Sequence, residues 1–201
     1  DMRAVVSFWG MFHVTKAVVA LALLIGLLLT GHQVWRAYAR VNAPAARAAI
    51  ALVGIAGAPI AAFVLLIVMA NIQGALAPLS SVMGLLPMDG SVPEVAQVRE
   101  QFAAGTISPV LETLIGDFRA YHLALVVIAA VAAVIVMTAD VVLWIRWSRM
   151  PRQDVRLRRV TATIAAVMPT FAVLLLFIMV VNLSTVAATA PALAAFFGGS
   201  L

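Results

Sequence analysis

The chain has 201 residues, of which 65% are hydrophobic and 10% are charged, and its formal net charge is +5. A soluble domain carries about 25% charged residues on average, so this chain has too little polar surface to face water on every side. Composition therefore excludes a soluble enzyme, a disordered tail and a secreted disulfide scaffold. Cysteine is absent, which also excludes thiolate metal sites and iron–sulfur clusters. We expect an integral membrane protein.

Four long uncharged stretches divide the chain into transmembrane segments. A helix crosses the ~30 Å hydrocarbon core in about 20 residues, and the predicted helices cover residues 10–37, 47–73, 118–147 and 157–184. The apolar runs are continuous rather than alternating, which excludes β-barrel strands. The sequence therefore predicts an all-α, polytopic membrane protein. Because the chain begins with Asp1, we expect earlier residues to be missing or removed, and the first helix is too long for a signal peptide.

Basic residues indicate the orientation. Two loops, 36–47 and 146–159, hold nine arginines: Arg36, Arg40, Arg47, Arg146, Arg149, Arg152, Arg156, Arg158 and Arg159. The opposite side is net acidic and holds Arg3, Lys16, Arg99, Arg119, Asp1, Asp89, Glu94, Glu100, Glu112 and Asp117. The positive-inside rule places the arginine loops in the cytoplasm of a bacterial inner (plasma) membrane, with both termini and the 74–117 loop outside. The basic loops anchor to anionic lipid, and no nucleic-acid partner is expected.

The two halves of the chain align at a nearly constant offset. The aligned pairs are Trp9 and Phe118, Phe12 and Tyr121, His13 and His122, Trp35 and Trp144, Arg40 and Arg149, Pro59 and Pro169, and Asn71 and Asn182. Such residue types align by chance less easily than Ala, Val or Leu. The sequence therefore predicts a tandem duplication of a two-helix unit, with 1–76 as the first repeat, 77–117 as a connector and 118–201 as the second repeat. Two spans per unit make the repeats parallel.

The extracytoplasmic connector contains a short amphipathic helix. The segment PEVAQVREQFAAG places Val95, Val98 and Phe102 on one stripe, as expected for a helix at the membrane interface. Gly105 can end this helix. Ser108 and Pro109 then supply an N-cap and a first helical position, so we expect the third long helix to begin there and to project beyond the membrane.

The candidate site residues share one depth, at the outer boundary of the membrane: His13, Lys16, Asn71, His122 and Asn182. At a rise of ~1.5 Å per residue, His13 and Asn71 lie about 40 Å and 36 Å from the arginines at the far ends of their helices. The repeat alignment places His122 and Asn182 at the same level, and Lys16 lies one turn further into the first helix.

Three hypotheses remain open for this cluster. In the first, the neighbouring aromatic residues form an interfacial belt, and the His and Asn side chains hydrogen-bond across helices and fix their register. In the second, His13 and His122 are the axial ligands of a haem b held in the bundle. Against this, both histidines lie near the boundary, and no glycine beside either makes room for a porphyrin. In the third, the cluster binds a lipid headgroup or another anion, with Lys16 as the charge.

Asp140 is the other charged residue near a predicted span, close to the cytoplasmic end of the third helix. We expect it to form a structural pair with His32 or Arg36 across the axis that relates the repeats. The chain contains no HExxH, GxSxG or phosphate-binding glycine loop, and no intramembrane carboxylate cluster. The prediction is a protein that is not an enzyme, with no metal site and, apart from the haem alternative, no cofactor.

Two segments, FWGMFHVTKAVVALALLIGLLLTGHQVWRAYAR and VMANIQGALAPLSSVMGLLP, resemble four-helix membrane proteins of actinobacteria, of the mycobacterial type. Proteins of this type resemble accessory subunits of Mce-type lipid importers. The resemblance implies a non-catalytic, stabilising subunit of a larger inner-membrane complex, with an ABC-type lipid importer and membrane lipids as partners. The alternative is a membrane electron-transfer subunit in which His13 and His122 ligate haem b.

Overall fold

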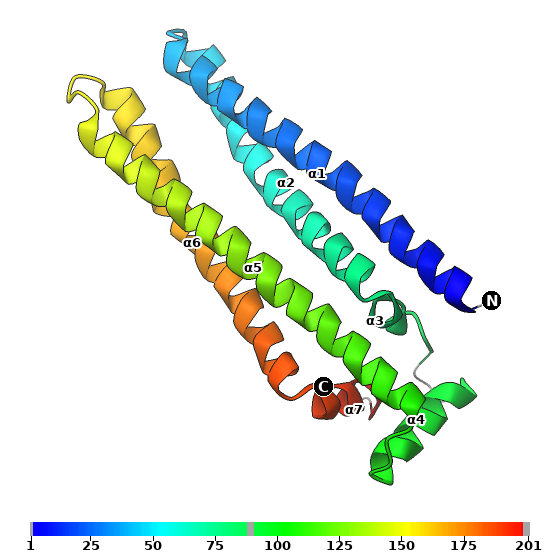
Figure 1. Ribbon diagram of the computed structural model, residues 1–201. Helices are drawn as coiled ribbons and strands as arrows, with labels where there is room; N and C mark the ends of the chain where they lie inside the picture. The colour runs from blue at the N-terminus through cyan, green and yellow to red at the C-terminus, as the bar shows by residue number, and fades with distance from the viewer. Residues whose placement is uncertain (1, 88–90, 199–201) are drawn as a thin grey trace. The chain divides into compact units, whose positions relative to one another are not determined.

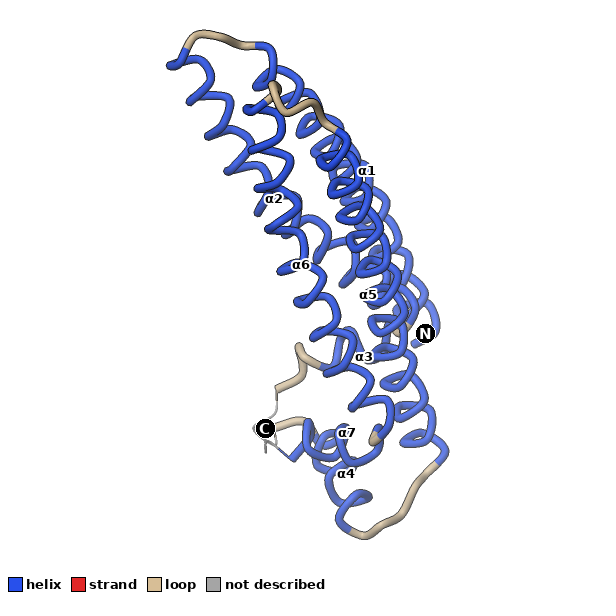
Figure 2. The backbone as a smooth tube through the Cα atoms, turned by 90° about the vertical axis from the view of Figure 1, so that its left-hand side faces the viewer, coloured by secondary structure: helices blue, strands red, loops and turns tan. Residues whose placement is uncertain are grey.

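The computed structural model describes residues 2–87 and 91–198, and this part of the chain is helical with short loops and no strand (Figure 2). Four helices are long: α1 (Met2–Arg40), α2 (Pro44–Leu76), α5 (Pro109–Arg149) and α6 (Val155–Ala187). Three are short: α3 (Pro78–Met83), α4 (Pro93–Ala103) and α7 (Thr189–Gly198). Figure 1 labels them in chain order. Asp1 and Asp89 of the acidic side, and the last three residues, lie outside the described residues.

The four long helices are apolar and long enough to cross a membrane, which confirms the predicted number of spans. Each extends beyond the predicted range at both ends, from two residues at the end of α5 to nine at its start, because the backbone hydrogen-bond ladder continues where the apolar run stops. Pro59 and Pro169 lie inside α2 and α6, and both helices continue through them. The fold is therefore that of an all-α protein with four candidate transmembrane helices.

The contacts divide the chain into two compact units that cut across the long helices. The first unit comprises the chain up to Val14, residues Ala70–Ala129 and the chain from Phe177 onward. The second comprises Thr15–Met69 and Ala130–Leu176. The first unit holds all three short helices together with the histidine- and asparagine-bearing ends of the long helices.

The first unit contains a small hydrophobic core built by α3, α4, α5 and α7. Its buried members are Met83, Val95, Leu111, Phe118, Leu193 and Phe197. Val95 is only 1% exposed, and Val98 and Phe102 pack against the same core, so the apolar stripe of α4 is covered by protein rather than left for a membrane interface. The projecting start of α5 and the docked α7 supply the apolar partners. The Nε of Arg99 on α4 also donates to the carbonyl oxygen of Phe197 on α7, at 2.5 Å.

The turn from α4 to α5 forms as the sequence predicts. Gly105 has a positive φ of 67°, a conformation that costs L-residues energy but suits glycine. The N–H of Thr106 donates to the carbonyl of Gln101 and that of Gly105 to the carbonyl of Phe102, which is the hydrogen-bond pattern of a Schellman motif. The Oγ of Ser108 then accepts from the N–H of Leu111 at 3.2 Å, so it caps α5.

The second unit contains the arginine-rich turns. In the α1–α2 hairpin, a Cβ at Gly54 would lie 3.6 Å from Cγ1 of Val34, which shows that the two helices are in van der Waals contact. In the α5–α6 hairpin, Nη1 of Arg158 donates to the carbonyls of Trp147 and Met150, at 2.9 and 2.7 Å, and its guanidinium lies 4.5 Å from the Trp147 ring centroid. Arg158 therefore caps the C-terminus of α5, where a positive charge is favourable.

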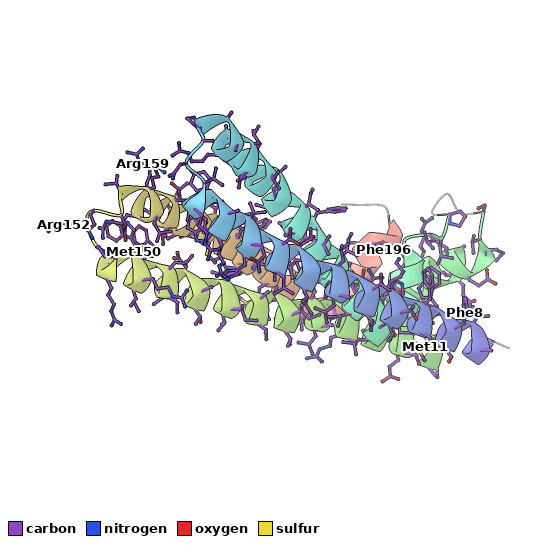
Figure 3. The ribbon with its side chains drawn as sticks, turned by 90° about the horizontal axis from the view of Figure 1, so that it is seen from above. Phe8, Met11, Met150, Arg152, Arg159 and Phe196 are labelled. Atoms are coloured by element: carbon purple, nitrogen blue, oxygen red, sulfur yellow. The ribbon has the colours of Figure 1, made fainter. Side chains whose placement is uncertain are left out.

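Other arginines of this turn point away from the helices. Arg152 and Arg159 project outward beside Met150 at the α5–α6 turn (Figure 3), and both are exposed. They are available for the anionic surface that the sequence analysis predicts for this end.

Candidate functional site

The first half of the site is a hydrogen bond between α1 and α2. Nδ1 of His13 lies 3.0 Å from Oδ1 of Asn71. Asn71 is 4% exposed, so its amide is buried where the two helices meet. A buried amide oxygen needs a donor, and the imidazole supplies it.

The second half repeats this bond between α5 and α6. Nδ1 of His122 lies 2.7 Å from Oδ1 of Asn182, and Nδ2 of Asn182 donates to the carbonyl of Ile178 at 2.8 Å. That second bond fixes the orientation of the amide, so Oδ1 is the atom that faces the ring and accepts. Nδ1 of His122 therefore carries the hydrogen, and Nε2 holds the lone pair of the neutral ring.

Aromatic side chains flank each histidine at the same two helical positions. In α1, the Trp9 and Phe12 rings lie 5.2 and 6.1 Å from the His13 ring between centroids, at 80° and 70°. In α5, the residues at the same spacing are Phe118 and Tyr121, whose centroids lie 4.5 and 5.5 Å from the His122 ring at 69° and 82°. Such edge-to-face contacts restrict the ring and hold it toward its asparagine.

Glycine makes room for one of the two histidines. A Cβ at Gly74 would lie 2.8 Å from both Cε1 and Nδ1 of His13, so only glycine lets the imidazole approach the α2 backbone this closely. The imidazole ring of His13 fills the space that the missing side chain of Gly74 leaves on α2. Nε2 of His13 is buried and has no hydrogen-bond partner among the described residues, whereas Nε2 of His122 is not sealed in this way.

A second polar contact docks α3 at the same end of the molecule. Oδ2 of Asp117 on α5 accepts from the backbone N–H of Ser80 at 2.7 Å and from its Oγ at 2.6 Å. Nε1 of Trp9 on α1 donates to Oγ of Ser81 at 2.6 Å. The carboxylate satisfies one of the N–H groups that the first turn of any helix leaves free and lies at the positive end of the helix dipole. Within the first unit, α3 thus bridges α1 and α5.

Lys16 and Asp140 both belong to the second unit, and Lys16 is exposed on α1. The structure gives no hydrogen bond or ion pair between Asp140 and either His32 or Arg36 within the described residues, and Oδ1 of Asp140 is buried without a partner. His32 and Arg36 are exposed. Asp140 instead lines a groove beside Pro169, so the predicted structural pair does not form.

The sequence analysis missed Gly74, Ser80 and Ser81, and counted Asp117 only as a surface charge. Pro78 is the sequence signal for the contact at Ser80, because a proline at the first position of a short helix marks a helix start whose N–H groups need an acceptor. Nothing in the sequence indicated which acidic residue would supply it.

Comparison with known proteins gives no match: no family model, no curated protein and no solved structure resembles this chain. The chemistry of the site therefore has to be judged from its geometry. Within residues 2–87 and 91–198, no group of three or more His, Asp or Glu side chains could hold a metal ion. The arrangement is suited to joining helices through His–Asn bonds, and Nε2 of each ring lies outside these bonds, buried without a partner in His13.

Proposed function

We propose that this protein is a non-catalytic, stabilising subunit of a larger inner-membrane complex. The observation that carries the proposal is how little of each long helix its own chain covers. Only 6–17% of the most apolar stretch of each candidate span is buried. The exposed remainder must be covered by lipid or by the helices of other subunits, and the polar residues of the candidate site are directed inward to join helices of this chain.

The repeated His–Asn bond supports the proposed tandem duplication. Both bonds join the same pair of atoms, Nδ1 and Oδ1, between consecutive long helices, and α2 and α6 have the same length, 33 residues. A short helix follows each of them, α3 and α7. Two copies of one hairpin explain these correspondences more simply than four independently evolved helices.

We assign the complex to the transport of lipid or another envelope component. This assignment rests on the resemblance to actinobacterial accessory subunits of Mce-type importers, and the apolar flanks of the helices are compatible with it. The partner is then an ABC-type lipid importer, and membrane lipids surround the chain.

Extraction of the native membrane in a mild detergent tests the accessory role. We expect the protein to elute as part of a larger particle with importer subunits at fixed stoichiometry, measured by size-exclusion chromatography and mass spectrometry. Deletion of the gene should lower the amount of those subunits in the membrane and the uptake of labelled lipid. A protein that elutes alone, with no change in the other subunits after deletion, would contradict the proposal.

The proposed orientation places the arginine turns in the cytoplasm and the α4–α5 turn outside. Because the chain has no cysteine, single cysteines report cleanly on sidedness. Thr106→Cys should react with a membrane-impermeant maleimide in intact cells, whereas Gln153→Cys should react only after permeabilisation. The reverse pattern would overturn the orientation.

A haem b electron-transfer subunit is the alternative function. One observation favours it: Nδ1 of His122 bonds Asn182, which leaves Nε2, the usual haem-ligating atom, outside that bond. In His13 the same nitrogen is buried. The purified protein would then show a Soret band that shifts on reduction and is lost in His122→Ala. Absence of haem absorbance in both oxidation states removes this alternative and leaves the accessory role unchanged.

A further inference from the structure

Asp140 is the one acidic side chain of the described chain with a buried oxygen that has no hydrogen-bond partner. It lies on α5 in the second unit, six residues before Arg146, which is about 9 Å along the helix. A buried polar group without a partner is rare and costly in proteins, and more so inside a bilayer. Asp140 as a whole is partly exposed, so a group outside the described residues can reach the rest of the carboxylate.

A groove of about 250 Å³ adjoins the carboxylate, between α5 and α6. Pro169 lies in its wall, with Met137, Val141 and Val173 around it. Those last three side chains are 51%, 56% and 65% exposed, so the groove opens on the outer surface of the hairpin. The groove therefore combines accessible apolar side chains with one acidic residue in its lining.

Within residues 2–87 and 91–198, no cation forms a hydrogen bond or ion pair with Asp140. Arg146 is six residues away on the same helix, which is not the i+3 or i+4 spacing at which helical side chains meet. His32 and Arg36, in the same unit, form no bond to Asp140 in the structure. An unpaired carboxylate in an apolar groove is complementary to a single positive charge on an apolar surface.

We propose that this groove binds a transmembrane helix of a partner subunit, through a Lys or Arg side chain of that helix that pairs with Asp140. The proposal rests on the accessory function proposed above and names its docking surface. The depth of Asp140 favours a helix over a lipid amine, because a headgroup would have to leave the interface to reach it. The position of a lysine along a transmembrane helix sets its depth in the membrane, so such a lysine can lie at the level of Asp140.

A synthetic transmembrane peptide provides the test. The full chain is reconstituted in phosphatidylcholine vesicles with a Leu/Ala peptide that carries one Lys six residues inside its basic flank, and with a matched peptide that has Leu there. Energy transfer between dyes on protein and peptide measures association. We expect the Lys peptide to bind about tenfold more tightly than the Leu peptide, a difference typical of one pairing in a bilayer.

Two variants connect the binding to the groove. Asp140→Asn keeps the shape of the side chain and should abolish the preference for Lys, whereas Asp154→Asn, which removes a carboxylate from the α5–α6 turn, should leave it unchanged. Ala172→Phe fills the groove without touching the carboxylate and should weaken binding of both peptides. Circular dichroism and size-exclusion chromatography confirm that each variant is folded.

Four results would overturn the inference. One is equal binding of the Lys and Leu peptides, and another is retention of the Lys preference in Asp140→Asn. The third is a disulfide-linked dimer of Val141→Cys that disappears in the Val141→Cys, Asp140→Asn double variant, because the occupant would then be a second copy of this chain. If native importer subunits co-purify equally with wild type and Asp140→Asn, this inference fails and the accessory role stands. If no subunit co-purifies with wild type, the accessory role fails whatever the peptide shows.

Discussion

The two hairpins carry the same polar bond in different surroundings. In α1–α2 the His13–Asn71 bond lies against Gly74, and the second ring nitrogen is sealed from solvent without a partner. In α5–α6 the His122–Asn182 bond has no such sealed nitrogen, and Thr185 occupies the place that corresponds to Gly74. The shared bond joins helices, and the difference around it decides which ring could take a further ligand.

The comparison of the two hairpins separates the His–Asn bond, which joins helices, from the second ring nitrogen, which does not take part in that bond. The His–Asn bond is present in both hairpins, so it accounts for the residues that align between the halves. Among the described residues, the buried histidine nitrogen without a partner belongs to His13, so we expect the two rings to differ in reactivity. Three predictions test this difference and a fourth tests the docking of α3, and the one with the largest expected effect comes first.

Gly74→Ala should destabilise the protein most. The added Cβ would lie 2.8 Å from two atoms of the His13 ring, and overpacking of this kind costs about 2 kcal/mol of unfolding free energy. Unfolding by SDS in mixed micelles, followed by circular dichroism, measures the change. Thr185→Ala is the matched control in the second hairpin and should change the free energy by less than about 0.5 kcal/mol.

The double variant His13→Ala, Gly74→Ala gives a further check on the cause. If the Gly74→Ala effect comes from the clash with the ring, it should vanish when the ring is absent. An equal loss of stability from Gly74→Ala in the presence and absence of His13 would show that the glycine acts in another way.

Asp117→Asn should loosen α3 without affecting α7. The substitution weakens two hydrogen bonds to Ser80 and removes the negative charge at the start of α3, which together contribute about 1.5 kcal/mol. Hydrogen exchange measured by mass spectrometry should rise over residues 78–83 and stay unchanged over 189–198. Glu112→Gln, at an exposed position of the same helix, is the control, and equal exchange in both variants would contradict the docking role.

Asn71→Leu and Asn182→Leu should lower stability unequally. Each removes an interhelical hydrogen bond, which contributes about 1 kcal/mol inside a membrane protein. The loss should be greater for Asn71, because the sealed His13 ring would then have no partner at either nitrogen, whereas His122 can be hydrated. The SDS titration measures both, and an equal or reversed order would contradict the difference between the hairpins.

Chemical modification should distinguish the two rings without changing stability. Diethyl pyrocarbonate acylates accessible imidazole nitrogens, so we expect His122 to react and His13 to be protected. His32 is exposed and serves as the internal positive control in the same digest. Modification of His13 at the rate of His32 would show that the first site is open.

The sequence predicted several features of the site because they depend on local rules. Gly105 and Ser108–Pro109 fix the α4–α5 turn through backbone conformation and capping, and these signals act within a few residues. The shared depth of His13 and Asn71 follows from helical rise alone. That Ser80 would meet Asp117, 37 residues away, has no local signal, because it depends on how α3 folds back onto α5.

Composition and periodicity by themselves determined four apolar helices and the alignment of His and Asn between the halves, since hydrophobic length and residue order are written directly in the chain. The tertiary structure alone decided that each histidine bonds the asparagine of its own hairpin, that Gly74 seals one ring, and that Asp140 is left beside a groove instead of meeting His32 or Arg36. The physical reason is that such contacts depend on the rotation of one helix about its axis relative to another. Packing between helix surfaces sets that rotation, and residue spacing along a single helix does not specify it.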